Sequence, residues 1–167
     1  YLAYKLSQNL GKTVIKPLIG SLGLGIILSE TPDLTYTISK RLVSLGQPVY
    51  LQGYVEKPQR DIRVFVVGDR VIGSIYRIAR GNIWKTNIAQ GAIPKPFKCN
   101  KDLEDLAVKI CRVLGLHYAG IDFVEDEEKG YIVLEVNASP LWKGLEKATG
   151  VDPASEIVDY VLREIKR

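Results

Sequence analysis

The chain has 167 residues, of which 46% are hydrophobic and 25% are charged, and its formal net charge is +4. This is the composition of an ordinary globular protein, with no apolar run long enough to span a bilayer and no secretory signal pattern, so we expect no membrane partner and a cytoplasmic location. Cys99 and Cys111 lack metal-ligand spacing, which agrees with a reducing compartment. The basic residues are scattered, which favours a small polyanionic ligand over nucleic acid.

The chain opens with a helical pattern. Leu2, Leu6 and Leu10 recur at helical spacing and predict a helix over residues 1–10. The sequence begins at Tyr1 within this pattern and contains no Met. We therefore expect a fragment of a longer protein, with its N-terminal part missing.

A lysine and a group of glycines follow this helix. Residues 13–16 predict a strand that ends at Pro17, and a second strand is expected near residues 26–28. A lysine buried on such a strand is costly without an anionic partner, and glycines let backbone amides approach a phosphate closely. We expect a phosphate-binding turn here, although an ordinary flexible hairpin accounts for the glycines equally well. The residues concerned are Lys16, Gly20, Ser21, Gly23 and Gly25.

Cap and turn residues divide the next stretch into elements. Thr31 stands before a proline and an acid, which predicts a helix that ends at Gly46, and residues 49–52 predict a strand. Residues 62–67 and 71–78 flank a Gly-Asp-Arg turn and predict an antiparallel hairpin. The polar stretch near residues 54–60 is the best hinge in the chain. We therefore expect two parts, residues 1–55 and residues 56–167.

Two helices are expected in the second part. One begins at Asn100 and ends at Gly115, and the other begins at Asp152, before a proline. The first should bury Leu103, Leu106, Ile110 and Leu114, and the second carries Ile157, Val161 and Ile165.

Two strand-like runs near the end of the chain carry carboxylates. A four-residue loop at residues 127–130 would place Asp122 opposite Glu135, and Asn137 shares the face of Glu135 because side chains alternate along a strand. Opposed carboxylates repel each other, so a cation between them would explain the arrangement. Two carboxylates and an amide oxygen suit Mg²⁺. The alternative is a polar outer face on an edge hairpin.

Several cationic residues lie between these two regions. Asp61 and Arg63 fall on one face of a predicted strand, and Arg77, Lys85 and Asn87 follow along the same part of the chain. Arginine is the best side chain for gripping carboxylate or phosphate oxygens. Taken singly, these residues fit a surface ion pair and a solvated sheet face. Their combination with the lysine, the glycines and the carboxylates favours a site for a phosphorylated ligand.

The order of these motifs resembles the ATP-grasp carboxylate–amine ligases, in particular the RimK type. The resemblance extends from about residue 13 to the last helix. It implies an α+β ATP-grasp fold, with part of the central lobe in residues 1–55 and a C-terminal lobe of antiparallel sheet and flanking helices in residues 56–167. The motifs that carry it are Lys16 with its glycines, Tyr-Leu-Gln-Gly-Tyr-Val at 50–55, Asp-Ile-Arg at 61–63, Trp-Lys-Thr-Asn at 84–87, Asp122, and Glu-Val-Asn-Ala-Ser-Pro at 135–140.

The resemblance also implies ATP and Mg²⁺ (or Mn²⁺) as cofactors and assigns roles to residues. The nucleotide phosphates would be held by Lys16 and the turn of Gly20, Ser21, Gly23 and Gly25. The adenine would meet Gln52, Tyr54 and Val55, and the ribose would face Glu56 or Asp61. The triphosphate and the reacting groups would lie near Lys85, Asn87 and Arg63. The metal would be held by Asp122, Glu135 and Asn137, and the substrate acid would face Arg63, Arg77 and Ser139.

Members of this family convert a carboxylate to an acyl phosphate with ATP, and an amine then displaces phosphate to give an amide. We expect a carboxylate acceptor and an amino acid such as glutamate as partners, and a homo-oligomer is left open. Two alternatives remain: a lysine- or arginine-biosynthesis ligase that acts on a carrier protein, and a non-catalytic binding module of the same fold. The sequence after Asn137 argues against the carrier-protein type.

Three positions depart from the family pattern. Gly53 stands where glutamate is usual, Lys85 replaces a common arginine, and Leu141 replaces a common glycine. Lysine lacks the bidentate grip of arginine. Together with the expected missing part, these departures predict weak or no ligase activity for the chain alone.

Overall fold

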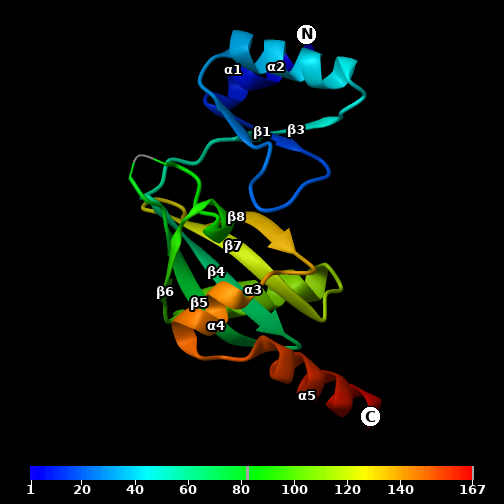
Figure 1. Cartoon of the computed structure of the whole chain (residues 1–167), viewed down its shortest axis with the longest axis vertical. Coiled ribbons are helices and arrows are strands. Elements are labelled where there is room, and N and C mark those ends of the chain that lie inside the picture. Colours follow the sequence, from blue (N-terminus) through cyan, green and yellow to red (C-terminus); the bar gives the residue numbers. More distant parts are fainter. Residues whose placement is uncertain (82, 167) are drawn as a thin grey trace. The chain divides into compact units, whose positions relative to one another are not determined.

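The computed structural model describes residues 1–81 and 83–166, and these divide into two compact units, Tyr1–Glu56 and Lys57–Arg167. The first unit contains the elements α1 (Leu2–Leu10), β1 (Thr13–Pro17), β2 (Ile27–Ser29), α2 (Pro32–Ser44) and β3 (Val49–Gly53). Its antiparallel strands are ordered β2-β1-β3, and α1 packs against α2 (Figure 1). The expected helix over residues 1–10 and the strands on both sides of the glycine turn are confirmed.

Small polar residues form the buried face of the two helices in the first unit. Ser7 on α1 and Thr35 and Ser39 on α2 are buried, and the Thr35 hydroxyl donates to Ser29 Oγ at 2.8 Å. The leucines that define the helical pattern over residues 1–10, Leu2, Leu6 and Leu10, are exposed. Small side chains let two helices approach closely, which is why the buried face does not follow the leucines.

The second unit is a five-stranded antiparallel sheet with helices on both faces (Figure 1). The strands are ordered β6-β5-β4-β7-β8. Its elements are β4 (Arg60–Val67), β5 (Arg70–Ile78), η1 (Ile88–Gln90), β6 (Ile93–Pro96), α3 (Lys101–Val113), β7 (Tyr118–Asp126), β8 (Gly130–Asn137), α4 (Lys143–Thr149) and α5 (Pro153–Ile165).

Alternation along the strands gives the sheet one apolar face and one mixed face. The apolar face packs against α3 through a core that includes Ile62, Val64, Phe123 and Leu103. The mixed face carries a smaller core of Phe65, Ile75 and Leu145, where α4 covers β5 and β6. The rest of that face is left to polar side chains.

The three predicted helix starts are confirmed by their caps. The Thr31 hydroxyl accepts from the Leu34 amide, Asn100 Oδ1 accepts from the Leu103 amide at 2.9 Å, and Asp152 Oδ1 accepts from the Ala154 amide at 3.0 Å. None of the described helices is long and apolar enough to cross a membrane.

The predicted inner face of α3 is partly wrong. Leu103 is buried as expected, and Leu106 and Ile110 are partly buried against the same core. Leu114, by contrast, is 55% exposed, and the buried Ala107 was not predicted. The helix ends at Val113, so Leu114 lies beyond its last turn. On α5, Val161 and Ile165 are likewise exposed.

The β7–β8 hairpin contains the expected residue pair, but its loop length and strand register differ from the prediction. Asp122 lies opposite Glu135, as predicted, but Asp126 pairs with Gly130, so the connection is one residue shorter than the predicted loop. A bulge after Asp122 shifts the register by one residue and restores the pairing.

Candidate active site

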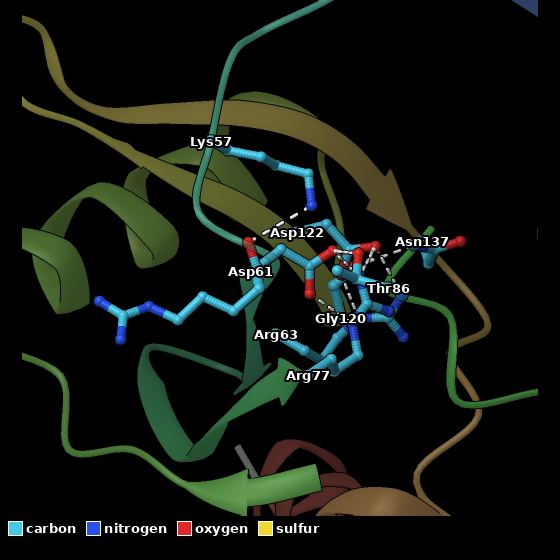
Figure 2. Close-up of polar contacts among 9 residues, drawn as sticks. Lys57, Asp61, Arg63, Arg77, Thr86, Gly120, Asp122 and Asn137 are labelled. Carbon is cyan, nitrogen blue, oxygen red and sulfur yellow. Dashed lines mark hydrogen bonds and ion pairs between the residues drawn. The ribbon is translucent and has the colours of Figure 1, made fainter. Parts of the chain in front are cut away.

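A row of charged side chains crosses the mixed face of the second sheet (Figure 2). Asp61 and Arg63 lie on the same face of β4, because residues two apart on a strand point the same way. In the strand register Asp61 faces Arg77 on β5, Arg63 faces Asp122 on β7, and Asp122 in turn faces Glu135 on β8. Four neighbouring strands therefore bring these five residues, which the sequence analysis had grouped only in part, onto one surface.

Asp122 lies near the middle of this row and is bound by two arginines. Arg63 donates to it through both Nε and Nη2, the latter at 2.8 Å, and Arg77 Nη2 also lies 2.8 Å from its Oδ2. The residue is only 4% exposed. Burial alone would raise the pKa of the Asp122 carboxyl, but the charges of Arg77 and Arg63 hold that pKa below its ordinary value. Asp122 is therefore ionised at neutral pH.

Arg77 joins Asp122 to a second buried carboxylate. Its Nε and Nη2 each lie 2.7 Å from an oxygen of Asp61, which gives a bidentate pair. The Thr86 hydroxyl donates to the same carboxylate. Asp61, Arg77 and Thr86 are all buried, so the alternative explanation of Asp61 and Arg63 as a surface ion pair is wrong.

Gly120 on β7 makes room for the side chain of Arg63. A Cβ atom at this glycine would lie 2.7 Å from Pro140 Cβ and 3.2 Å from Arg63 Cδ. A glycine within a strand often marks such a close approach. The Gly120 carbonyl also accepts a long hydrogen bond, 3.4 Å, from Asn137 Nδ2.

Asp122, Glu135 and Asn137 share this face, as predicted, but in different surroundings. The Glu135 side chain is exposed and forms no hydrogen bond or ion pair within residues 1–81 and 83–166, whereas the Asp122 side chain is buried and bound by Arg63 and Arg77. In that same part of the chain no three His, Cys, Asp or Glu side chains gather into a metal-binding group. The expected set has only two carboxylates and depends on Asn137, so its oxygen donors still suit Mg²⁺.

Lys57 was missed by the sequence analysis because no motif marks it. Its side chain points toward Asp61 and Asp122 in Figure 2, and its Nζ donates to the Arg60 carbonyl at 3.3 Å. Burial lowers the pKa of the Lys57 ammonium, while the charges of Asp61 and Asp122 oppose that shift. Thr86 lies within the Trp-Lys-Thr-Asn motif at residues 84–87, but its contact with Asp61 follows only from the fold.

The remaining predicted residues of the second unit lie in the segment before η1 and in the segment after β8. Lys85 lies 5.8 Å from the ring centre of Trp84, and the backbone carbonyl of Asn87 accepts from the Gln90 amide at 2.9 Å. Ser139 is exposed in the segment after β8.

In the first unit, the strand register places Lys16 and Gln52 on one face of the sheet. Lys16 pairs with Tyr50 and Val14 pairs with Gln52, and residues two apart share a face. Glu56, one of the two residues expected to face the ribose, forms an exposed ion pair of 2.8 Å with Lys12. Tyr54, expected to meet the adenine, donates its amide to the Lys12 carbonyl.

The glycine turn of the first unit has an unusual backbone. Gly23 and Gly25 both have φ of 74°, which favours glycine, and Leu22 adopts φ of 60°. Ile19, between β1 and this turn, is 94% exposed. Gly20 and Ser21 are also exposed.

Comparison with known proteins identifies the family. The model of the RimK-like ATP-grasp domain matches residues 5–161. The chain belongs to the RimK-like ATP-grasp family. The predicted fold class, an α+β ATP-grasp fold, is thereby confirmed.

Relatives of this RimK-like domain include ligases of two kinds. It is 37% identical over 170 residues to the alpha-aminoadipate–LysW ligase LysX of Sulfolobus acidocaldarius, covering 99% of this chain and 61% of the relative. It is 33% identical over 156 residues to a probable alpha-L-glutamate ligase of Histophilus somni strain 2336, covering 93% of this chain and 52% of the relative. The RimK-like domain thus spans between half and two thirds of these relatives.

A solved structure supports the same fold. The ATP-grasp ligase PsnB, complexed with precursor peptide PsnA2 and AMPPNP, is 25% identical, with a TM-score of 0.74. The match covers 98% of this chain and 50% of PsnB.

Proposed function

We propose that this domain belongs to an ATP- and Mg²⁺-dependent ligase that joins a carboxylate to the amino group of an amino acid, by way of an acyl phosphate. The observation that carries the proposal is the row of charged side chains on the second sheet, in a chain that belongs to the RimK-like ATP-grasp family. PsnB, of the same fold, has been solved with AMPPNP, and in another structure with Mg and ADP.

The metal ligands in this proposal are Asp122, Glu135 and Asn137. All three lie on one face of β7 and β8, and their oxygens suit Mg²⁺. When bound, Mg²⁺ would offset negative charge on the transferring phosphoryl group. Asp122 stays ionised because of its arginines, and Glu135 is exposed and unpaired in the described chain, so both can offer charged oxygens.

The arginines supply positive charge to the same surface. Arg63 reaches Asp122 from β4, and Arg77 spans Asp61 and Asp122, so both guanidinium groups lie beside the proposed metal ligands. Fixed cations of this kind stabilise negative charge that develops on oxygens during acyl and phosphoryl transfer. Arg63 and Arg77 would orient the substrate acid with Ser139, and Lys85 and Asn87 would contact phosphate oxygens.

The first unit would contribute residues to nucleotide binding. Lys16 would contact its phosphates, and the glycine turn, in which Gly20, Ser21 and Gly25 are exposed, would present backbone amides to them. The adenine would be met by Gln52, Tyr54 and Val55, and the ribose by Glu56.

Two acceptor classes are candidates. A carboxylate acceptor joined to glutamate follows from the motif set and from the probable alpha-L-glutamate ligase relative. A carrier-protein acceptor is favoured by the 37% identity to LysX, which weighs against the argument from the residues after Asn137. Neither relative separates the two, so both acceptors belong in the assay.

Turnover tests this proposal. ADP release by the natural full-length protein should require Mg²⁺, an acceptor acid and glutamate together, and Asp122→Ala should abolish it. The matched control is Glu128→Ala, which removes an exposed carboxylate from the β7–β8 turn and should leave turnover unchanged. A non-catalytic binding module would release no ADP and would keep partner binding in both variants, and that result would contradict the proposal.

A further inference from the structure

The Asp61 carboxylate is occupied entirely by its protein partners. Two nitrogens of Arg77 bind its two oxygens at 2.7 Å, the Thr86 hydroxyl binds one of them as well, and the residue is 3% exposed. Its bonds join the carboxylate to β5 through Arg77 and to the segment before η1 through Thr86. This environment differs from that of the exposed Glu56, the other residue expected to face the ribose.

Thr86 connects this carboxylate to the segment that precedes η1. It is the buried residue of segment 83–87, and its neighbours Lys85 and Asn87 are half-buried. Figure 2 shows Thr86 beside Asp61, with Arg77 on the opposite strand. The segment then turns at Asn87, whose carbonyl accepts from the amides of Gln90 and Ala92.

We infer that Asp61 and Thr86 are positioning residues, which fix segment 83–87 against the charged sheet face and so place Lys85 and Asn87 for their ligand. Through Arg77 the same contacts tie this segment to Asp122. The inference rests on the proposed function for what Lys85 and Asn87 contact, but the anchoring itself can be measured without any ligand.

Thr86→Val is the cleanest test of this anchoring. Valine has the shape of threonine and lacks the hydroxyl, while Asp61 keeps both bonds from Arg77, so the sheet should still fold. Thr86→Ser restores the hydroxyl, and Thr37→Val makes the same change at an exposed position on α2. Asp61→Asn and the double variant Asp61→Asn/Thr86→Val complete the set.

Hydrogen exchange and steady-state kinetics are measured on every variant in the natural full-length protein, and AMPPNP affinity is measured on Asp61→Asn and Thr86→Val. Hydrogen exchange of the Gln90, Gly91 and Ala92 amides reports whether the turn after segment 83–87 stays ordered, since these amides bond to Asn87 and Ile88. Steady-state kinetics give kcat and the KM of the acceptor. A displacement of about 1 Å costs about a hundredfold in rate, so we expect kcat of Thr86→Val to fall by about 10- to 100-fold.

The expected pattern has four parts. Thr86→Val speeds exchange at the three amides by about tenfold or more and lowers kcat without changing the acceptor KM, consistent with a local loss of order. Thr86→Ser returns both values to within about threefold of the parent, since only the hydroxyl is required. Thr37→Val matches the parent. The double variant is no worse than the poorer single variant, because coupled residues act as a unit.

Unchanged exchange and kcat in Thr86→Val would overturn the inference. So would a loss of AMPPNP affinity in Asp61→Asn while Thr86→Val behaves as the parent, because Asp61 would then contact the nucleotide directly. If the parent itself shows no Mg·ATP-dependent turnover, the proposed function fails instead. In that case faster exchange in Thr86→Val still supports the anchoring, and unchanged exchange overturns it.

Discussion

Replacing Arg77 with methionine should strongly destabilise the second unit. Arg77 is 5% exposed and binds two carboxylates that are themselves buried, Asp61 and Asp122. Methionine has a similar length but no charge. Removing one partner of a buried ion pair costs about 3–5 kcal/mol, because the other charge is left without compensation. Asp122 keeps Arg63 and Asp61 keeps Thr86, so we expect the lower end, about 3 kcal/mol.

Urea unfolding followed by tryptophan fluorescence measures this loss. Both tryptophans, Trp84 and Trp142, belong to the second unit, so the signal reports that unit alone. With a urea slope of about 2 kcal/mol per M, a loss of about 3 kcal/mol lowers the midpoint by about 1.5 M. The slope itself should stay unchanged.

A matched control separates burial from charge. Arg70 pairs with Glu156 but is 49% exposed, and surface pairs contribute about 0–1 kcal/mol, so Arg70→Met should shift the midpoint by less than about 0.5 M. The double variant Asp61→Asn/Arg77→Met also removes one of the buried carboxylate charges that Arg77→Met leaves without its partner, so it should recover part of the lost stability. A midpoint for Arg77→Met no lower than that of Arg70→Met would refute the reasoning.

Two further predictions concern the same sheet face. Gly120→Ala places a Cβ against Pro140 and Arg63 and should lower the free energy of unfolding by about 1–3 kcal/mol in the same urea assay. Gly53→Ala is the control: the atom nearest to its added Cβ lies 3.5 Å away, so its circular-dichroism melting curve should be nearly unchanged. Equally small effects of the two substitutions would argue against the close approach at Gly120. Because the folded-state pKa of Asp122 is depressed, its contribution to stability is present above the ordinary value of 3.8 and is lost as pH falls from 3.8 through the folded-state pKa. The stability of Asp122→Asn should therefore fall less than that of the parent in this pH range, and parallel urea midpoints against pH would count against the paired state of Asp122.

Local signals in the sequence account for much of the fold. Thr31, Asn100 and Asp152 mark helix starts because a side-chain oxygen can satisfy free amides at a helix end, whatever the tertiary context. Helix burial is less predictable. Ala107 is buried although it carries little apolar surface, and Leu114 is exposed because α3 ends at Val113.

The candidate site shows the same division between local and non-local information. The buried pair of Asp61 and Arg77 depends on a bulge between Phe65 and Val66, and counting from the turn without that bulge would place Asp61 opposite Tyr76. A one-residue slip moves a side chain to the other face, so the pair could not be derived from spacing. For Asp122 and Glu135 the predicted pairing was correct only because a bulge offset the shorter connection.

Calorimetric titration with Mg·ATP tests the central claim most directly. The parent, Glu135→Gln and the control Glu128→Gln would be titrated with and without Mg²⁺, on the present chain and on the natural full-length protein. We predict binding that requires Mg²⁺ in the parent and the control and that is lost in Glu135→Gln. Absence of Mg²⁺-dependent binding in the full-length parent, or equal binding in Glu135→Gln, would contradict the assignment of this sheet face as the metal and nucleotide site.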